Sequence, residues 1–428
     1  MIIIDELYGL LDFPEYLTPI ITSPELQRLR DVRLLNVFST SLSSLSDVSR
    51  LTHTLGVTSL FLRLKPKFLA ASGSDIYLYK TIEIACLIHD VATPAFAHLF
   101  ENELKQTSGW NHEAQCEALI KGTYAPGNIY HQIYYKNQLS LHQKILELGI
   151  DPEQVWLTIT GKGQYGQLLC GTIDLDNIDN VARMHNSLGL GNLGLNTFSI
   201  IDALIPHKRN LVFKGDKITS VKQWMQARKS CYDLLVFDEQ TLSGQAMLGK
   251  LIKDAIDSGF LNEEFWYLTD DQLLNKLIDF PLGKDVIKRL TVGNTYATLG
   301  IYWLDYDDQI VDWLNSNGNR KSMSDQLSSD LKIPCLVYYF QDKGTFSKKL
   351  NIMVGDSIEN IEFTSIGEDS HSIIIGIFTS SQDTHAISSS KKQVSQLFDS
   401  LLPSKPSRRN LPVVRSYFGI NYQKEFFI

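Results

Sequence analysis

Two histidines and an aspartate lie close together in an apolar stretch of this chain. The segment LIHDVATPAFAHLF, residues 87–100, puts His89 beside Asp90 and adds His98 nine positions after His89. His89 and Asp90 end an apolar segment that we predict to be a buried helix, in which neighbouring residues differ by about 100° in direction. Both side chains can therefore converge on one ion near the helix end. The alternative is that all three are core residues with ordinary hydrogen-bond partners.

The dipeptide Thr93-Pro94 is predicted to end this helix and to start the next one. Threonine can cap a helix, and proline is tolerated in the first turn, where its missing N–H is not needed. A continuous helix would point His98 roughly away from His89. The break is expected to turn His98 back toward the same cavity.

Further metal-binding residue types occur in two other segments. His53 lies in SRLTHTLGV, and three aspartates lie in GTIDLDNIDNVAR, at positions 174, 176 and 179. Imidazole and carboxylate groups together suit a divalent ion that keeps open positions for water and phosphate oxygens. The sequence thus favours a metal site that joins distant segments.

The order of these residues resembles the H…HD…D pattern of the HD-domain metal-dependent phosphohydrolases. The likeness is closer to their deoxynucleoside triphosphate triphosphohydrolase branch and extends over roughly residues 5–300. It is carried by SPELQRLRDVRLL, SRLTHTLGV, HDVATPAFAH, GWNHEAQ, IDLDNIDNVAR and FWYLTDDQLL. The resemblance implies a divalent metal, with Mn, Mg, Fe, Co, Ni and Zn all possible. The ligands that it implies are His53, His89, Asp90 and Asp176.

The same resemblance implies catalytic and substrate-binding roles. His112 would protonate the leaving oxygen, and Glu113 would orient His112 and raise its pKa. The alternative for His112 is a surface histidine at the start of a helix that Asn111 could cap. Arg50 lies three residues before His53 on the same helix face and is expected to bind phosphate, with a surface ion pair as the alternative. His98 is also expected to contact phosphate, with a core histidine as the alternative.

The helix that carries Asp176 is expected to have internal support. Asp179 and Arg183 are four residues apart, a spacing at which side chains of opposite charge meet on a helix.

Several residues depart from the pattern of the triphosphohydrolase branch. Thr93 stands where that branch has a second histidine, and Asn177 and Asn180 stand where it has a lysine and a tyrosine. We place Asn177 and Asn180 in the substrate pocket. Met184 and Leu34 replace two more polar residues of the branch. Because a site that hydrogen-bonds its substrate discriminates strongly, these changes indicate a different substrate or reaction outcome.

Apolar spacing predicts a mainly α fold, an HD-domain helical bundle with a smaller α+β C-terminal region. Helical patterns occupy residues 23 to about 310, and short β-branched and aromatic segments follow from about residue 325. We divide the chain into a helical phosphohydrolase domain, 1–320, and an α+β region of unknown role, 321–428. Residues 205–217 and 388–392 are predicted to be loops.

Composition limits the partners. The net charge of −8 disfavours binding to long nucleic acid, which usually requires a basic excess. The five cysteines are scattered and form no CxxC pair, which indicates reduced thiols in a cytoplasmic protein. No run of about 18 apolar residues occurs, so we expect no membrane span. Because the related enzymes are oligomers, a homodimer or homotetramer is expected.

These features predict a metal-dependent phosphohydrolase that cleaves a phosphate ester of a nucleotide or a related molecule. One alternative is an HD-type nuclease or cyclic-nucleotide phosphodiesterase. Another is a nucleotide-binding sensor with weak turnover, which is consistent with the replacements at Thr93, Asn177 and Asn180.

Overall fold

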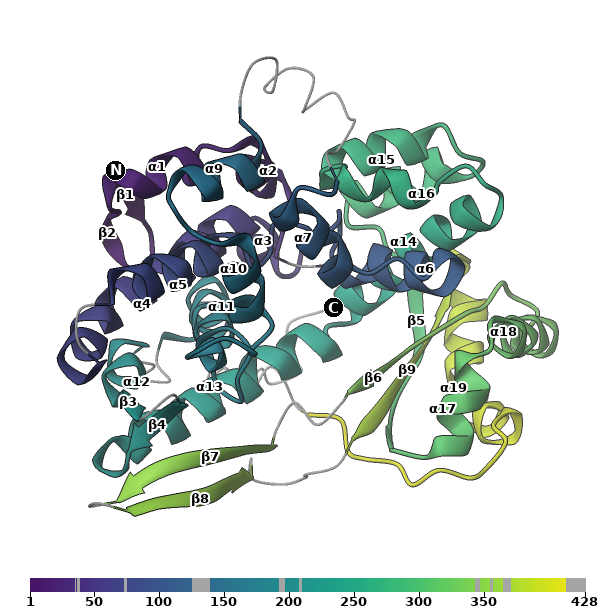
Figure 1. Ribbon diagram of the computed structural model, residues 1–428. Helices are drawn as coiled ribbons and strands as arrows, with labels where there is room; N and C mark the ends of the chain where they lie inside the picture. Colours follow the sequence, from purple (N-terminus) through teal and green to yellow (C-terminus); the bar gives the residue numbers. More distant parts are fainter. Residues whose placement is uncertain are drawn as a thin grey trace.

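Helices form most of the protein, as the ribbon in Figure 1 shows. The computed structural model describes residues 1–34, 36, 39–72, 75–124, 139–191, 197–207, 210–342, 347–354, 357–364 and 371–412. The predicted fold class, mainly α with a smaller α+β region toward the C-terminus, is confirmed. Within these described ranges, no helix combines the length and the apolar content that a membrane span needs.

Three helices carry the residues of interest: α4 (Arg50–Ser72), α5 (Ile76–Ile88) and α11 (Leu175–Ser187). Helix α5 is central, and every side chain from Thr81 to Ile88 is buried, as its apolar sequence predicts. Its one buried carboxylate, Glu83, forms an ion pair with Lys65 on α4, in which Nζ lies 2.6 Å from Oε1. Because a buried charge needs a partner, this pair helps to fix α4 against α5.

The remaining helices before residue 295 pack around these three in one apolar core. They are α1 (Thr18–Ile21), α2 (Pro24–Arg28), α3 (Ser43–Ser46), α6 (His98–Ser108), α7 (His112–Lys121), α9 (Leu141–Glu147), α10 (Pro152–Ile159), α12 (Thr197–Ala203), α13 (Ile218–Phe237), α14 (Glu239–Asp257), α15 (Asp270–Ile278) and α16 (Gly283–Thr291). Short 3-10 segments lie at Glu15–Leu17, Leu29–Asp31, Gly166–Leu168, Gly215–Lys217 and Glu263–Tyr267.

Polar caps fix where several of these helices begin. Ser23 caps α2, Pro24 occupies its first position, and the α-helix ends at Arg28. Asn111 caps α7, where its Oδ1 accepts a hydrogen bond from the Ala114 N–H at 2.7 Å. Thr269 and Gln272 form a reciprocal capping box at the start of α15.

Two small sheets accompany the helical part. Strands β1 (Ile2–Asp5) and β2 (Gly9–Asp12) form an N-terminal hairpin. Strands β3 (Leu204–His207), β4 (Asn210–Lys214), β7 (Ser347–Val354) and β8 (Ser357–Thr364) form a second sheet in that order. The loop prediction for residues 205–217 was therefore wrong. Strand β4 pairs in parallel with β7, a partner far away in the sequence that local patterns do not reveal.

The third sheet belongs to the C-terminal part. Its antiparallel order is β5 (Ala297–Asp305), β9 (Ser372–Thr379) and β6 (Leu336–Asp342), and β9 is buried along its whole length. Helices α17 (Asp308–Asn315), α18 (Asn317–Leu331) and α19 (Thr384–Leu401) lie beside this sheet in Figure 1. The four strands predicted after residue 325 are confirmed as β6 to β9. The loop prediction for residues 388–392 was wrong, because these residues lie within α19, which packs Val394 and Phe398 into the core beneath the sheet.

The C-terminal sheet also contacts the helical part. Trp303, Ile374 and Phe378 pack against Leu242 and Ala246 of α14. The main apolar core contains residues up to Leu290 and also Ile352 of β7, whereas a second core begins at Leu299. The domain boundary at residue 320 stays a prediction.

Candidate metal centre

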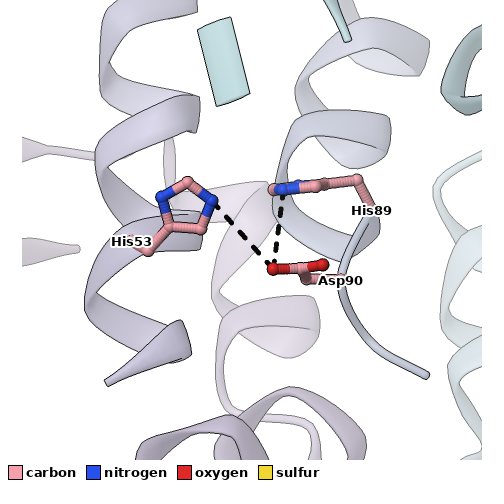
Figure 2. Close-up of side chains that lie close together, drawn as sticks. All are labelled: His53, His89 and Asp90. Carbon is pink, nitrogen blue, oxygen red and sulfur yellow. Dashed lines mark ion pairs between the residues drawn. The ribbon is translucent and has the colours of Figure 1, made fainter. Parts of the chain in front are cut away.

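Helices α4 and α5 bring His53, His89 and Asp90 together. His53 lies one turn into α4 and is 1% exposed, whereas His89 and Asp90 directly follow the end of α5. Figure 2 shows both imidazoles directed toward the Asp90 carboxylate. Its Oδ2 lies 4.0 Å from Nε2 of His53 and 3.9 Å from Nε2 of His89. One potential ligand atom from each of the three residues lies within 4.8 Å of the other two.

Helix α11 supplies a fourth side chain at the same place. Asp174 caps this helix, and Asp176 follows in its first turn. Oδ1 of Asp176 lies 3.0 Å from Nε2 of His53 and 3.9 Å from Nε2 of His89. The structure therefore brings the four predicted metal ligands together from three distant segments.

The environment of His89 provides a test of whether these residues fit a metal. Nδ1 of His89 lies 2.9 Å from the carbonyl oxygen of Cys86, to which it can donate, which leaves the lone pair on Nε2. Nε2 is buried and has no hydrogen-bond partner within the described part of the chain. A buried nitrogen without a partner is costly unless something else occupies its lone pair. Together with two carboxylates and a second imidazole, this nitrogen fits a divalent metal.

Charges around the centre keep its carboxylates ionised. Burial opposes ionisation of Asp90, but the Arg50 guanidinium and the two histidines outweigh it and hold the pKa of Asp90 well below its usual range. Burial also opposes ionisation of Asp176. The hydrogen bond and the charge of His53 outweigh burial, so the pKa of Asp176 is lowered too. Ionised carboxylates are the form that binds metals.

A second layer of contacts holds His53. Its Nδ1 lies 2.7 Å from Oδ2 of Asp179, and that same oxygen accepts a hydrogen bond from Nε of Arg183 at 2.8 Å. The predicted Asp179–Arg183 pair is therefore present, but its contact with His53 was not predicted. Burial opposes the imidazolium form of His53, whereas hydrogen bonds to Asp176 and Asp179 favour it and raise its pKa to about 10 without a metal.

Arg50 points into the centre and makes an ion pair there. Its Nη1 lies 2.7 Å from Oδ2 of Asp90, and its side chain is largely buried. The other oxygen of Asp90 accepts a hydrogen bond from the Thr93 hydroxyl at 3.0 Å. Arg50 was expected to bind phosphate or to form a surface ion pair. The structure shows an ion pair with Asp90, but this pair is largely buried.

His98 and His112 share one carboxylate that the sequence reasoning missed. Oε2 of Glu101 lies 3.0 Å from Nδ1 of His98, and Oε1 lies 2.5 Å from Nδ1 of His112. Glu113, which was predicted to orient His112 and to raise its pKa, is exposed and makes a smaller contribution to raising that pKa, whereas the hydrogen bond to Nδ1 comes from Glu101. The pKa of His112 is lowered by burial and raised more strongly by Glu101, with a net increase. Because Glu101 lies eleven residues before His112, only the turn between α6 and α7 brings them together.

The two predicted substrate-binding asparagines lie on α11. The Asn177 amide donates a hydrogen bond to Oδ1 of Asp174 at 2.8 Å, so this side chain supports the start of its own helix. Asn180 lies half-buried one turn further along.

The segment between Asp90 and His98 does not form the predicted helix start at Thr93-Pro94. Helix α6 begins at His98, and the preceding Phe96 and Ala97 have φ values of 51° and 45°, which are strained for residues other than glycine. Oδ1 of Asp270 accepts a hydrogen bond from the Phe96 N–H at 2.8 Å and holds this conformation.

Arg28 holds the beginning of the same segment. Its Nη2 donates to the carbonyl oxygens of Val91 and Thr93 at 3.2 and 2.5 Å. Arg28 and Asp270 lie in PELQRLR and LTDDQLL, so two segments used only for the family resemblance position the chain next to Asp90.

Comparison with known proteins places this architecture. No family model matches the chain. A phosphohydrolase from Bacteroides thetaiotaomicron is 16% identical with a TM-score of 0.68, and the match covers 89% of this chain and 100% of that one. A hypothetical protein from Aquifex aeolicus is 17% identical with a TM-score of 0.66, and the match covers 92% of this chain and 99% of that one. Similarity at these identities shows that the chain shares the fold of a protein named as a phosphohydrolase. The His-His-Asp cluster that could hold a metal ion is a feature of the chain's own structure.

Proposed function

We propose that this protein is a metal-dependent phosphohydrolase that cleaves a phosphate ester of a nucleotide or a related molecule. The observation that carries the proposal concerns the buried Nε2 of His89, which has no hydrogen-bond partner among the described residues. It faces the carboxylates of Asp90 and Asp176 beside Nε2 of His53. The fold shared with a protein named as a phosphohydrolase supports the same reaction class.

The residues proposed to hold the metal are His53, His89, Asp90 and Asp176. When bound, a divalent metal lowers the pKa of water and offsets the negative charge of phosphate oxygens. Arg50 contributes a positive charge beside Asp90 and orients that carboxylate, and Thr93 holds its other oxygen.

His112 is proposed as the proton donor to the leaving oxygen. Its Nδ1 is committed to Glu101, so Nε2 is left for the substrate, and Glu101 favours the protonated form that a donor needs. The His98 side chain is 68% exposed and shares Glu101, which makes it suitable for contact with a substrate phosphate. In the hydrolysis, the P–O bond to the leaving group breaks and the oxygen of water forms the new P–O bond. The leaving oxygen takes the proton from His112.

The substrate is proposed to differ from that of the triphosphohydrolase branch. Thr93 and Asn177 occupy positions at which that branch has larger polar groups. Both side chains donate hydrogen bonds within the protein, Thr93 to Asp90 and Asn177 to Asp174. This arrangement also favours the second candidate, a nucleotide-binding sensor with weak turnover.

A substrate screen tests the function. Metal-stripped protein is loaded with Mn, Mg, Fe, Co, Ni or Zn and incubated with nucleoside mono-, di- and triphosphates, cyclic nucleotides and short oligonucleotides, and the products are identified by mass spectrometry. The proposal expects release of a phosphate-containing product that is lost in Asp90→Asn. Turnover that survives Asp90→Asn would refute the metal-dependent mechanism. Tight nucleotide binding without turnover would favour the sensor, and cleavage confined to oligonucleotides or cyclic nucleotides would favour the nuclease or phosphodiesterase alternative.

The proposed assembly is a homodimer or homotetramer. Light scattering on protein eluting from a size-exclusion column measures its mass and tests this proposal separately.

A further inference from the structure

The turn of the N-terminal hairpin is connected by hydrogen bonds to the residues that surround the metal centre. Asp5 ends β1 and is 5% exposed. Its Oδ1 accepts hydrogen bonds from the N–H groups of Leu7 and Tyr8, both at 2.9 Å, and these bonds close the turn. Its Oδ2 accepts a hydrogen bond from Nη2 of Arg183 at 2.9 Å. Asp5 therefore joins the hairpin to α11.

Arg183 continues this connection to a proposed metal ligand. Its side chain is fully buried, and its Nε donates to Oδ2 of Asp179 at 2.8 Å. The same oxygen lies 2.7 Å from Nδ1 of His53, whose Nε2 faces Asp90 and Asp176. Three contacts shorter than 3 Å thus connect a residue at the start of the chain with the ring that would bind the ion.

Gly56 gives independent support for a tightly fixed arrangement. It lies one turn after His53 on α4, and a Cβ atom there would come within 2.1 Å of Oδ1 of Asp179 and 2.3 Å of Nη2 of Arg183. The Asp179–Arg183 pair therefore packs directly against the backbone of the helix that carries His53. Because Gly56 has no side chain to separate α4 from α11, a shift of the Asp179–Arg183 pair would be transmitted to His53.

We propose that the N-terminal hairpin is part of the metal centre, with Asp5 as a positioning residue that acts through Arg183 and Asp179 to hold His53 ready for a divalent cation. A carboxylate that accepts the Nδ1 proton fixes the ring and keeps the lone pair on Nε2. Asp5 shares the charge of Arg183 and leaves Asp179 a stronger acceptor. Without Asp5, the guanidinium would interact with Asp179 alone and weaken its hold on His53. The inference rests on the metal centre of the proposed function.

Binding of Mn²⁺ to Asp5→Asn protein tests the proposal. The substitution keeps the size of the side chain and an oxygen for the turn, but it replaces the acceptor that Arg183 uses. Calorimetric titration of metal-stripped, folded protein is expected to show a Kd weaker by about 10-fold, within the range found when partners of metal ligands are lost. The matched control is Asp12→Asn, because Asp12 is an exposed residue of the same hairpin, and its Kd should not change.

Thermal unfolding of the metal-free proteins separates positioning from simple stabilisation. A lower Tm of Asp5→Asn with an unchanged Kd would mean that Asp5 is only structural, and this result would overturn the inference. Wild-type protein that binds no divalent cation would overturn the proposed function as well, so the two failures are distinguishable.

Hydrogen exchange of the wild-type protein gives a second test that needs no variant. Because coupling between two places is reciprocal, Mn²⁺ should slow exchange of the Leu7 and Tyr8 amides, which donate to Asp5. Amides of α19, which belongs to the second core, serve as the control. Exchange at Leu7 and Tyr8 that is identical with and without Mn²⁺ would contradict the proposal.

Discussion

Glu101 accepts a hydrogen bond from Nδ1 of His112 at 2.5 Å and thereby ties the first turn of α7 to α6. This contact raises the pKa of His112 in spite of burial, so the imidazole stays protonated to a higher pH than it would alone. As the proposed proton donor, His112 would lose this function as the pH rises through its pKa.

Glu101→Gln should therefore move the alkaline limb of kcat/KM to lower pH, by about one to three pH units, the range for loss of a neighbouring opposite charge. The measurement is a pH profile of the hydrolysis found in the substrate screen. Glu113→Gln is the comparison variant: Glu113 is exposed and contributes less than Glu101 to the pKa of His112, so this substitution should move the limb by a smaller amount. If Glu113→Gln moves the limb and Glu101→Gln does not, the assignment of Glu101 is incorrect.

Asp90→Asn should abolish tight metal binding. The substitution removes a charged oxygen that faces both His53 and His89 and leaves Arg50 without its carboxylate. The loss of metal affinity should reach at least about 100-fold, the upper end of what removal of a ligand's partner costs. Metal content after dialysis, measured by atomic emission, checks this expectation. Asp47→Asn, at an exposed site just before α4, should keep its metal.

Asp270 should make the stability of the protein depend on pH. Burial raises its pKa to about 6 from the ordinary 3.8, although the Phe96 and Arg33 N–H groups lower it in part. Between these values the folded state holds a proton that the unfolded state has lost, so stability falls as the pH rises through this window and levels off above it. The contribution of Asp270 should weaken by about 2 kcal/mol from pH 4 to pH 7.

Urea unfolding of metal-free protein at pH 4 and pH 7 measures this effect. The stability difference between wild type and Asp270→Asn should shrink at the higher pH. Asp271→Asn is the control, because the neighbouring Asp271 side chain is 67% exposed. An equal difference at both pH values would show that Asp270 titrates normally.

Gly56→Ala should destabilise the protein by about 1–3 kcal/mol, the usual cost of overpacking. The new methyl group would overlap Asp179 and Arg183, which are buried and held on both sides. Gly318→Ala is the control, since Gly318 also lies in a helix and a Cβ there meets nothing closer than 3.7 Å. The free energy of unfolding from urea titration compares the two, and equal values would count against the close approach of α4 and α11.

Sequence patterns predicted the residues whose roles depend on type and order along the chain. His53, His89, Asp90 and Asp176 were grouped by their motif, and the structure places them within a few ångströms of one another. The strands from residue 336 onward were predicted because β-branched and aromatic residues alternate with turns.

The missed features depend on contacts between different secondary-structure elements. Pro94 suggested a helix start, but the backbone at Phe96 takes a left-handed conformation that Asp270, on another helix, stabilises. Glu101 was overlooked because its partner His112 lies on the next helix rather than on the same one. Strand β4 was assigned to a loop. It pairs locally with β3, but its parallel pairing with β7, which joins it to the rest of the sheet, spans well over 100 residues. Local periodicity contains no information about such contacts.

The path of the chain after residue 295 makes its two cores mutually dependent. Strand β5 leaves the helical part and pairs with β9, and β7 later returns to pair with β4 and puts Ile352 into the first core. Cutting the gene at residue 320 would leave β5 with an open edge and expose Trp303 to solvent. A fragment of this kind should aggregate instead of folding, so trimming is a poor route to a smaller folded protein.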